Sequence, residues 1–84
     1  MFNRYVISYD FNLSSSSIAP DSLSVVRAVE NTAAALRQEG MTCQLAGGLV
    51  IDETAKSFSI NCTDNFARKL SATPGMIALQ KVAR

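Results

Sequence analysis

The chain has 84 residues, 48% of them apolar, and its eight Lys and Arg against seven Asp and Glu give a net charge of +1. These values predict one domain over residues 1–84 with a small core, and they disfavour a nucleic-acid binder, because phosphate contacts call for a clear basic excess. No apolar segment approaches the length of a membrane span. The first residues lack the basic and apolar blocks of a signal peptide, so we expect a cytoplasmic protein.

Residues 4–11 alternate between polar and apolar side chains, which is the pattern of a strand with one buried face. Large apolar groups on that face require helices to cover them. The inward residues are expected to be Tyr5, Ile7, Tyr9 and Phe11. Four serines at 14–17 and a proline at 20 then predict a loop.

The next segment predicts a helix that begins at Asp21 or Ser22 and ends near Glu39, with Gly40 in the C′ position behind it. Its apolar residues recur at spacings of three and four, so they share one face. That buried face is expected to consist of Leu23, Val26, Val29, Ala33 and Leu36.

Residues 41–51 and 57–62 are predicted to form two antiparallel strands joined by a four-residue loop at 53–56. A loop of this length places Ile51 opposite Phe58, and it keeps the apolar residues of both strands on one side of the sheet. The pair Gly47-Gly48 predicts a bulge or bend. The inward residues are expected to be Met41, Cys43, Leu45, Leu49, Ile51, Phe58, Ile60 and Cys62.

The two cysteines are expected to be reduced thiols in the core. In the register above Cys62 lies opposite Gly47, and Cys43 is displaced from it by about 13 Å at the rise of a strand. That distance is beyond the reach of a disulfide.

A short second helix is predicted from Thr63 or Asp64 to about Ser71, and its buried stripe is expected to be Phe66, Ala67 and Leu70.

Thr73-Pro74-Gly75 predicts a turn, because proline presets one backbone angle and glycine accepts the unusual one. Residues 76–82 are predicted as the last strand, with Ile77 and Leu79 facing inward. The complete order is strand, helix, strand, strand, helix, strand. It predicts an α+β, ferredoxin-like fold, in which both helices cover one face of a four-stranded antiparallel sheet.

The residue types argue against an enzyme. The sequence has no histidine, and it contains neither a nucleophile-elbow serine motif nor a glycine-rich phosphate loop. Gly40-Met41-Thr42-Cys43 resembles the opening of the heavy-metal-associated motif, but Ala46 stands where that motif has its second cysteine. We expect no cofactor and no metal site.

Residues 4–12, RYVISYDFN, resemble the first strand of the small CRISPR-associated adaptation proteins and their toxin-like relatives. In that family an Asp at this position can bind a divalent metal at a dimer interface, and some members cleave nucleic acid. The resemblance implies that Asp10 serves a metal-dependent, nucleic-acid-processing dimer. The alternative is that Asp10 is a solvated side chain at the end of a strand.

Three segments of the C-terminal third, residues 56–60, 66–70 and 74–79, resemble the subtilisin-propeptide inhibitor family. Members of that family lay the exposed face of their sheet against a protease and feed a C-terminal tail into its cleft. The resemblance implies that residues 80–84 form such a tail.

The sheet face away from the helices is predicted to carry small polar groups and no aromatic ring, which disfavours RNA stacking and suits either docking on a protein or simple solvation. We therefore expect a non-enzymatic protein-binding module, an inhibitor of a larger protein or complex, of the size of stand-alone inhibitors such as those of phages. An edge strand, the second or the fourth, offers a route to a homodimer. The expected protein-binding residues are Arg4, Ser8, Gln44, Ser57, Ser59, Gln80, Lys81 and Arg84.

Overall fold

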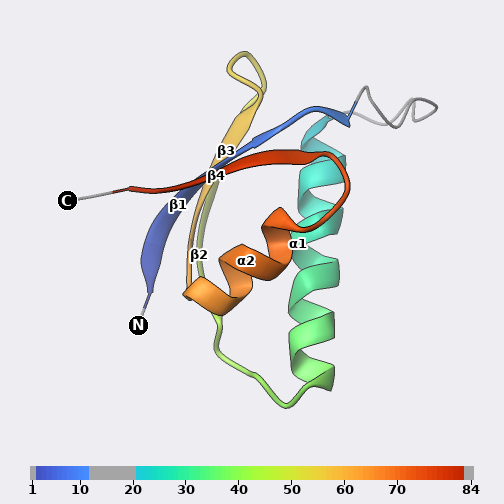
Figure 1. Cartoon of the computed structure of the whole chain (residues 1–84), viewed down its shortest axis with the longest axis vertical. Helices are drawn as coiled ribbons and strands as arrows, with labels where there is room; N and C mark the ends of the chain where they lie inside the picture. The colour runs from blue at the N-terminus through green and yellow to red at the C-terminus, as the bar shows by residue number, and fades with distance from the viewer. Residues whose placement is uncertain (1, 12–20, 83–84) are drawn as a thin grey trace.

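A computed structural model describes residues 2–11 and 21–82 and confirms the predicted α+β, ferredoxin-like arrangement (Figure 1). Four antiparallel strands form one sheet in the order β2-β3-β1-β4, with β1 and β3 in the centre. The serines at 14–17 lie outside the described residues. The elements are β1 (Asn3–Tyr9), α1 (Asp21–Gln38), β2 (Leu45–Asp52), β3 (Ser57–Cys62), α2 (Asp64–Ser71) and β4 (Met76–Lys81).

The two central strands supply the middle of the core, as their alternation predicts. In the register of this pair Ile7 lies opposite Phe58 and Tyr5 lies opposite Ile60. These residues and Tyr9 and Cys62 are buried, while Phe11 is partly buried and stacks on Tyr9 with 5.0 Å between ring centroids. The inward direction predicted for both strands is confirmed.

Helix α1 covers this core, but the set of residues that it buries differs in part from the predicted set. Leu23 is 40% exposed, and Val26 and Ala33 are only partly buried, so the predicted stripe is wrong in part. The buried residues are Val25, Ala28, Val29, Thr32 and Leu36. Thr32 can enter this face because its hydroxyl donates a 2.8 Å hydrogen bond to the carbonyl oxygen of Ala28.

Gly40 ends α1 in the predicted C′ position. Its φ is +82°, and its amide donates to the carbonyl oxygen of Arg37 at 3.0 Å. The amide of Met41 donates to the carbonyl oxygen of Leu36 at 2.8 Å. These two bonds form a Schellman motif, which satisfies carbonyl groups that the helix leaves open.

Strand β2 begins later than predicted. Cys43 has a φ of +58° and is exposed, and Met41 is 39% exposed, so the prediction that both face inward is wrong. A residue in the left-handed region interrupts the alternation of a strand, and regular pairing begins only at Leu45. The core receives Leu45, Leu49 and Ile51 from this strand.

The predicted bulge at Gly47-Gly48 is confirmed. Both glycines have positive φ, +97° and +73°, and the pairing of β2 with β3 shifts around them. Because of this shift Leu45 lies opposite Cys62, whereas Gly47 lies opposite Asn61, so the predicted pairing of Gly47 with Cys62 is wrong. Beyond the bulge Ile51 lies opposite Phe58, as the four-residue loop predicts.

Helix α2 buries the predicted stripe of Phe66, Ala67 and Leu70. Thr63 is its N-cap, and the Thr63 hydroxyl oxygen accepts a hydrogen bond of 3.3 Å from the amide of Phe66. Among the described residues, neither helix is long and apolar enough to cross a membrane.

Strand β4 agrees only in part with the prediction that Ile77 and Leu79 face inward. Leu79 lies opposite the inward residue Ile7, so its direction is confirmed, although it remains 38% exposed. Ile77 is 61% exposed, so its predicted inward position is wrong. The pairing with β1 shifts between Ser8 and Tyr9, and Met76 takes the place opposite Tyr9. The preceding turn is confirmed: Gly75 has a φ of +98°, and the amide of Met76 donates to the carbonyl oxygen of Thr73 at 3.1 Å.

Candidate protein-binding surface

The side of the sheet away from the helices, which we call the open face, is built by the alternation of its four strands. Residues paired across antiparallel strands point to the same side, so the pairings define rows. The central row is Val50, Ser59, Val6 and Gln80. The row beside it is Asp52, Ser57, Ser8 and Ala78, and on the other side Asn61 lies opposite Arg4.

The open face combines a small apolar centre with polar surroundings. Val50 is 59% exposed, while Val6 and Ser59 are partly buried although no helix covers them. The hydroxyl groups of three serines can each donate and accept hydrogen bonds. No aromatic residue occurs in these rows, so the face offers shape and hydrogen bonds to a partner rather than stacking.

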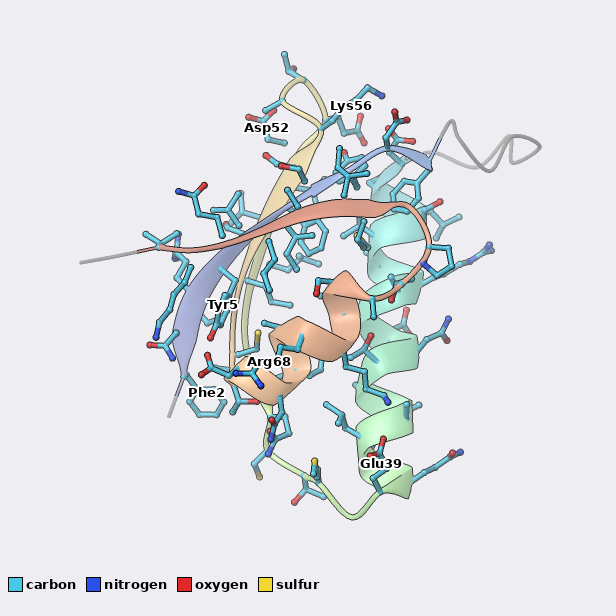
Figure 2. All side chains as sticks on the ribbon, in the orientation of Figure 1. Phe2, Tyr5, Glu39, Asp52, Lys56 and Arg68 are labelled. Carbon is cyan, nitrogen blue, oxygen red and sulfur yellow. The ribbon has the colours of Figure 1, made fainter. Side chains whose placement is uncertain are left out.

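Charged side chains lie at both ends of the open face. Figure 2 shows Asp52 and Lys56 near the tip of the β2–β3 hairpin and Phe2 towards the other end of the sheet, where Arg4 follows two residues later. The orientation of Asp52 is set by its Oδ1 atom, which accepts hydrogen bonds from the amides of Thr54 at 3.0 Å and Ala55 at 3.1 Å.

The structure brings together most of the predicted protein-binding residues but separates two of them from the open face. Gln44 precedes β2, and its Oε1 atom accepts a 2.6 Å hydrogen bond from the hydroxyl of Thr63 at the N-cap of α2. Lys81 lies opposite the inward residue Tyr5, so its register is that of the helix side. Arg84 lies outside the described residues. The predicted residues that share the open face are Arg4, Ser8, Ser57, Ser59 and Gln80.

Two residues of the open face were missed by the sequence prediction. Val50 and Asp52 alternate with Leu49 and Ile51. The period of two that places Leu49 and Ile51 inward could therefore have placed Val50 and Asp52 outward. The glycine bulge hides this signal, because it changes the parity between the beginning and the end of β2.

The propeptide resemblance implies that residues 80–84 form a tail, but this segment begins inside β4. Gln80 pairs with Val6 and Lys81 pairs with Tyr5. The amide of Val82 also donates to the carbonyl oxygen of Arg4 at 2.9 Å. The chain therefore remains attached to the sheet through Val82.

Asp10 follows β1 at the end of the sheet where the last turn packs. Its amide donates to the carbonyl oxygen of Gly75 at 2.7 Å, and the residue is partly buried. Within residues 2–11 and 21–82, no group of three or more His, Cys, Asp and Glu is placed to hold a metal ion.

Two tyrosine hydroxyl groups lie inside the core. The hydroxyl oxygens of Tyr5 and Tyr9 are buried, and neither has a hydrogen-bond partner among the described residues. Burial, followed by the carboxylates of Asp21, Glu53 and Asp52, raises the pKa of Tyr9. Tyr9 therefore stays neutral at physiological pH and acts as a packing residue.

The two cysteines are free thiols with different environments. Cys62 is buried as predicted, whereas Cys43 is exposed in the loop before β2. In the native protein we expect a thiol reagent to modify Cys43 rapidly and Cys62 only when the fold opens, because the reagent must reach the sulfur. The rate of thiol modification is followed by absorbance with and without denaturant. The Cys43→Ser variant should lack the rapid phase of modification. Rapid modification of both thiols in native protein would contradict the burial of Cys62.

Burial of Cys62 also predicts a loss of stability in alkali. Burial raises the pKa of the Cys62 thiol from its ordinary 9.0 to about 11. Because the folded-state pKa is the higher one, this stabilising contribution is complete below pH 9 and is lost as the pH rises towards about 11. The loss is at most about 2–3 kcal/mol. Urea unfolding of wild type and Cys62→Ala at several alkaline pH values tests this, and parallel pH dependences would contradict it.

No family model matches the chain, and no curated protein matches it.

Proposed function

We propose that the protein is a non-enzymatic protein-binding module that inhibits a larger protein, and that the open face is its contact surface. One observation carries this proposal. Both helices pack on the same side of the sheet, and the row of Val50, Ser59, Val6 and Gln80 remains uncovered on the other side.

The composition of the open face resembles that of protein interfaces, which surround an apolar centre with a polar rim. The face is small, however. Four strands spaced about 4.8 Å apart and six residues rising about 3.3 Å each define roughly 300 Å². A standard interface buries about 800 Å² on each partner. A single copy is therefore expected to bind its target weakly unless neighbouring loops add to the contact.

The resemblance of the C-terminal third to subtilisin propeptides suggests a class of target. In this chain the open face is uncovered, and β4 begins near α1 and runs away from that helix (Figure 1). Both features suit a module that lies against a protease and directs its C-terminus towards the cleft. A subtilisin-type serine protease is accordingly the first target to test.

The experiment measures inhibition of peptide hydrolysis by wild type and by two lysine variants. Val50→Lys places a charge in the centre of the open face, at a side chain already 59% exposed. Ala34→Lys places the same charge at an exposed position of α1, far from that face in the fold, and serves as the matched control. We expect inhibition by wild type and by Ala34→Lys, and a loss of about tenfold or more in affinity for Val50→Lys.

The outcomes separate the parts of the proposal. Equal inhibition by the two variants would show that the open face is not the contact surface. No inhibition by wild type would reject subtilisin-type proteases as the target.

A further inference from the structure

We propose that β4 pairs with β4 of a second copy of this chain, so that two molecules share one continuous antiparallel sheet. The sheet has two edges, β2 and β4, and they differ in how well they can accept another strand. Edge β2 is interrupted by Gly47 and Gly48, whose positive φ values shift its pairing. A bulge of this kind twists an edge strand and opposes the addition of a further strand.

Edge β4 lacks this protection along its regular part. From Ala78 to Lys81 it pairs with β1 without a break, and Lys81 is its single charged residue. Two apolar side chains of this edge are unusually exposed: Ile77 is 61% exposed, and Leu79 is 38% exposed although it lies opposite the inward residue Ile7. An exposed apolar edge strand is the feature that favours pairing with another chain.

The backbone groups of β4 that remain available can be deduced from its pairing with β1. The amide of Val82 donates to the carbonyl oxygen of Arg4, so this pair is hydrogen-bonded across the two strands. In an antiparallel ladder, hydrogen-bonded and non-hydrogen-bonded pairs alternate. The amide and carbonyl groups of Leu79 and Lys81 therefore point away from β1, towards the free edge.

These outward groups, with the side chains beside them, are self-complementary about a two-fold axis at Leu79. In that register Leu79 lies beside Leu79 of the second copy, and Lys81 lies beside Ile77 of the second copy, where its aliphatic stem can cover an apolar side chain. The two Lys81 ammonium groups are four residues apart along the strands, about 13 Å, which exceeds the screening length at physiological salt. No like charges meet, and a second copy thus fits this edge.

The contrast between the edges also explains why pairing would stop at two copies. Each molecule offers β4 once, and after pairing only the two bulged β2 edges remain. The contact is isologous and closes on itself, which prevents growth into a fibre. The two open faces would lie on the same side of the shared sheet and double the surface for a partner. This last consequence rests on the proposed function, but the dimer does not.

The test uses charge at Ile77, the most exposed of the large apolar side chains within residues 2–11 and 21–82, where folding tolerates substitution best. In the proposed register position 77 lies beside Lys81 of the second copy. We therefore expect Ile77→Lys to raise the dimer dissociation constant by about tenfold or more, and Ile77→Glu to leave it unchanged or lower it. Sedimentation velocity from micromolar to submillimolar protein measures both, with circular dichroism as the check on folding.

A second pair of variants tests the two-fold axis. Leu79→Lys and Leu79→Glu each oppose like charges across the axis, so each alone should be monomeric, whereas an equimolar mixture should restore the dimer. Val50→Lys, on the other edge strand, should remain dimeric even where it loses inhibition of the protease. A wild type that is monomeric over the whole range, or folded Ile77→Lys and Leu79→Lys variants that dimerise like wild type, would overturn the proposal.

Discussion

Replacing Phe58 by alanine is expected to lower the free energy of unfolding by about 3–5 kcal/mol, the range for removal of a buried aromatic ring. Phe58 is 1% exposed, it lies opposite both Ile7 and Ile51, and its ring centroid is 6.2 Å from that of Tyr9. A domain of this size has a total stability of about 5–10 kcal/mol, so a loss of this size should move the midpoint of urea unfolding to a much lower urea concentration. Urea unfolding measures the effect.

The matched control removes the same side chain from the surface. Phe2 is 47% exposed, and Phe2→Ala should change the free energy of unfolding by less than about 1 kcal/mol. Similar losses for the two variants would mean that the centre of the sheet is not where the core is most tightly packed.

Gly75→Ala is expected to destabilise the protein by about 2–4 kcal/mol, from two separate causes. The φ of Gly75 is +98°, which disfavours any residue with a Cβ atom, and a Cβ at this position would collide with Cδ1 of the Phe11 ring. Its carbonyl oxygen also accepts the hydrogen bond from the amide of Asp10, so displacement of the turn disturbs the end of β1. Thermal and urea unfolding would both report the loss.

Gly40 provides the control that separates the two causes. Its φ is +82°, but a Cβ there meets no atom within 4 Å. Gly40→Ala should therefore cost only the backbone strain, about 1–2 kcal/mol. The difference between the two alanine variants measures the collision with Phe11, and adding Phe11→Ala to Gly75→Ala should relieve it. Equal costs at both glycines would show that the contact with Phe11 contributes nothing.

The open face and the β4 edge are different surfaces of one sheet. Val50 belongs to the open face on the β2 side, whereas Ile77 and Leu79 belong to the opposite edge. A charge at one surface is not expected to affect the other directly. Dimerisation would nevertheless strengthen binding of a partner, because the contact area available to it would be doubled.

Periodicity along the chain is enough to predict the elements whose pattern has only one physical solution. In β1 and β3 the period of two is complete, and shifting it by one residue would bury Arg4 and Asn61 without partners. The stripe of Phe66, Ala67 and Leu70 likewise leaves α2 one apolar face. The hairpin loop follows from the same rule, because a loop one residue longer would turn Ile51 and Phe58 to opposite sides of the sheet.

Other features depend on neighbours distant in sequence, so they become defined only when the chain is folded. The rotation of α1 depends on Thr32, whose burial becomes inexpensive only when its hydroxyl bonds back to the helix. Gln44 does not lie on the predicted surface, because its side chain accepts a hydrogen bond from Thr63, nineteen positions later in the sequence. Ile77 has the residue type of the core, but the shift between β1 and β4 gives its place to Met76. Periodicity specifies which face of a strand or helix is apolar, whereas the extent to which neighbours cover that face is a property of the assembled chain.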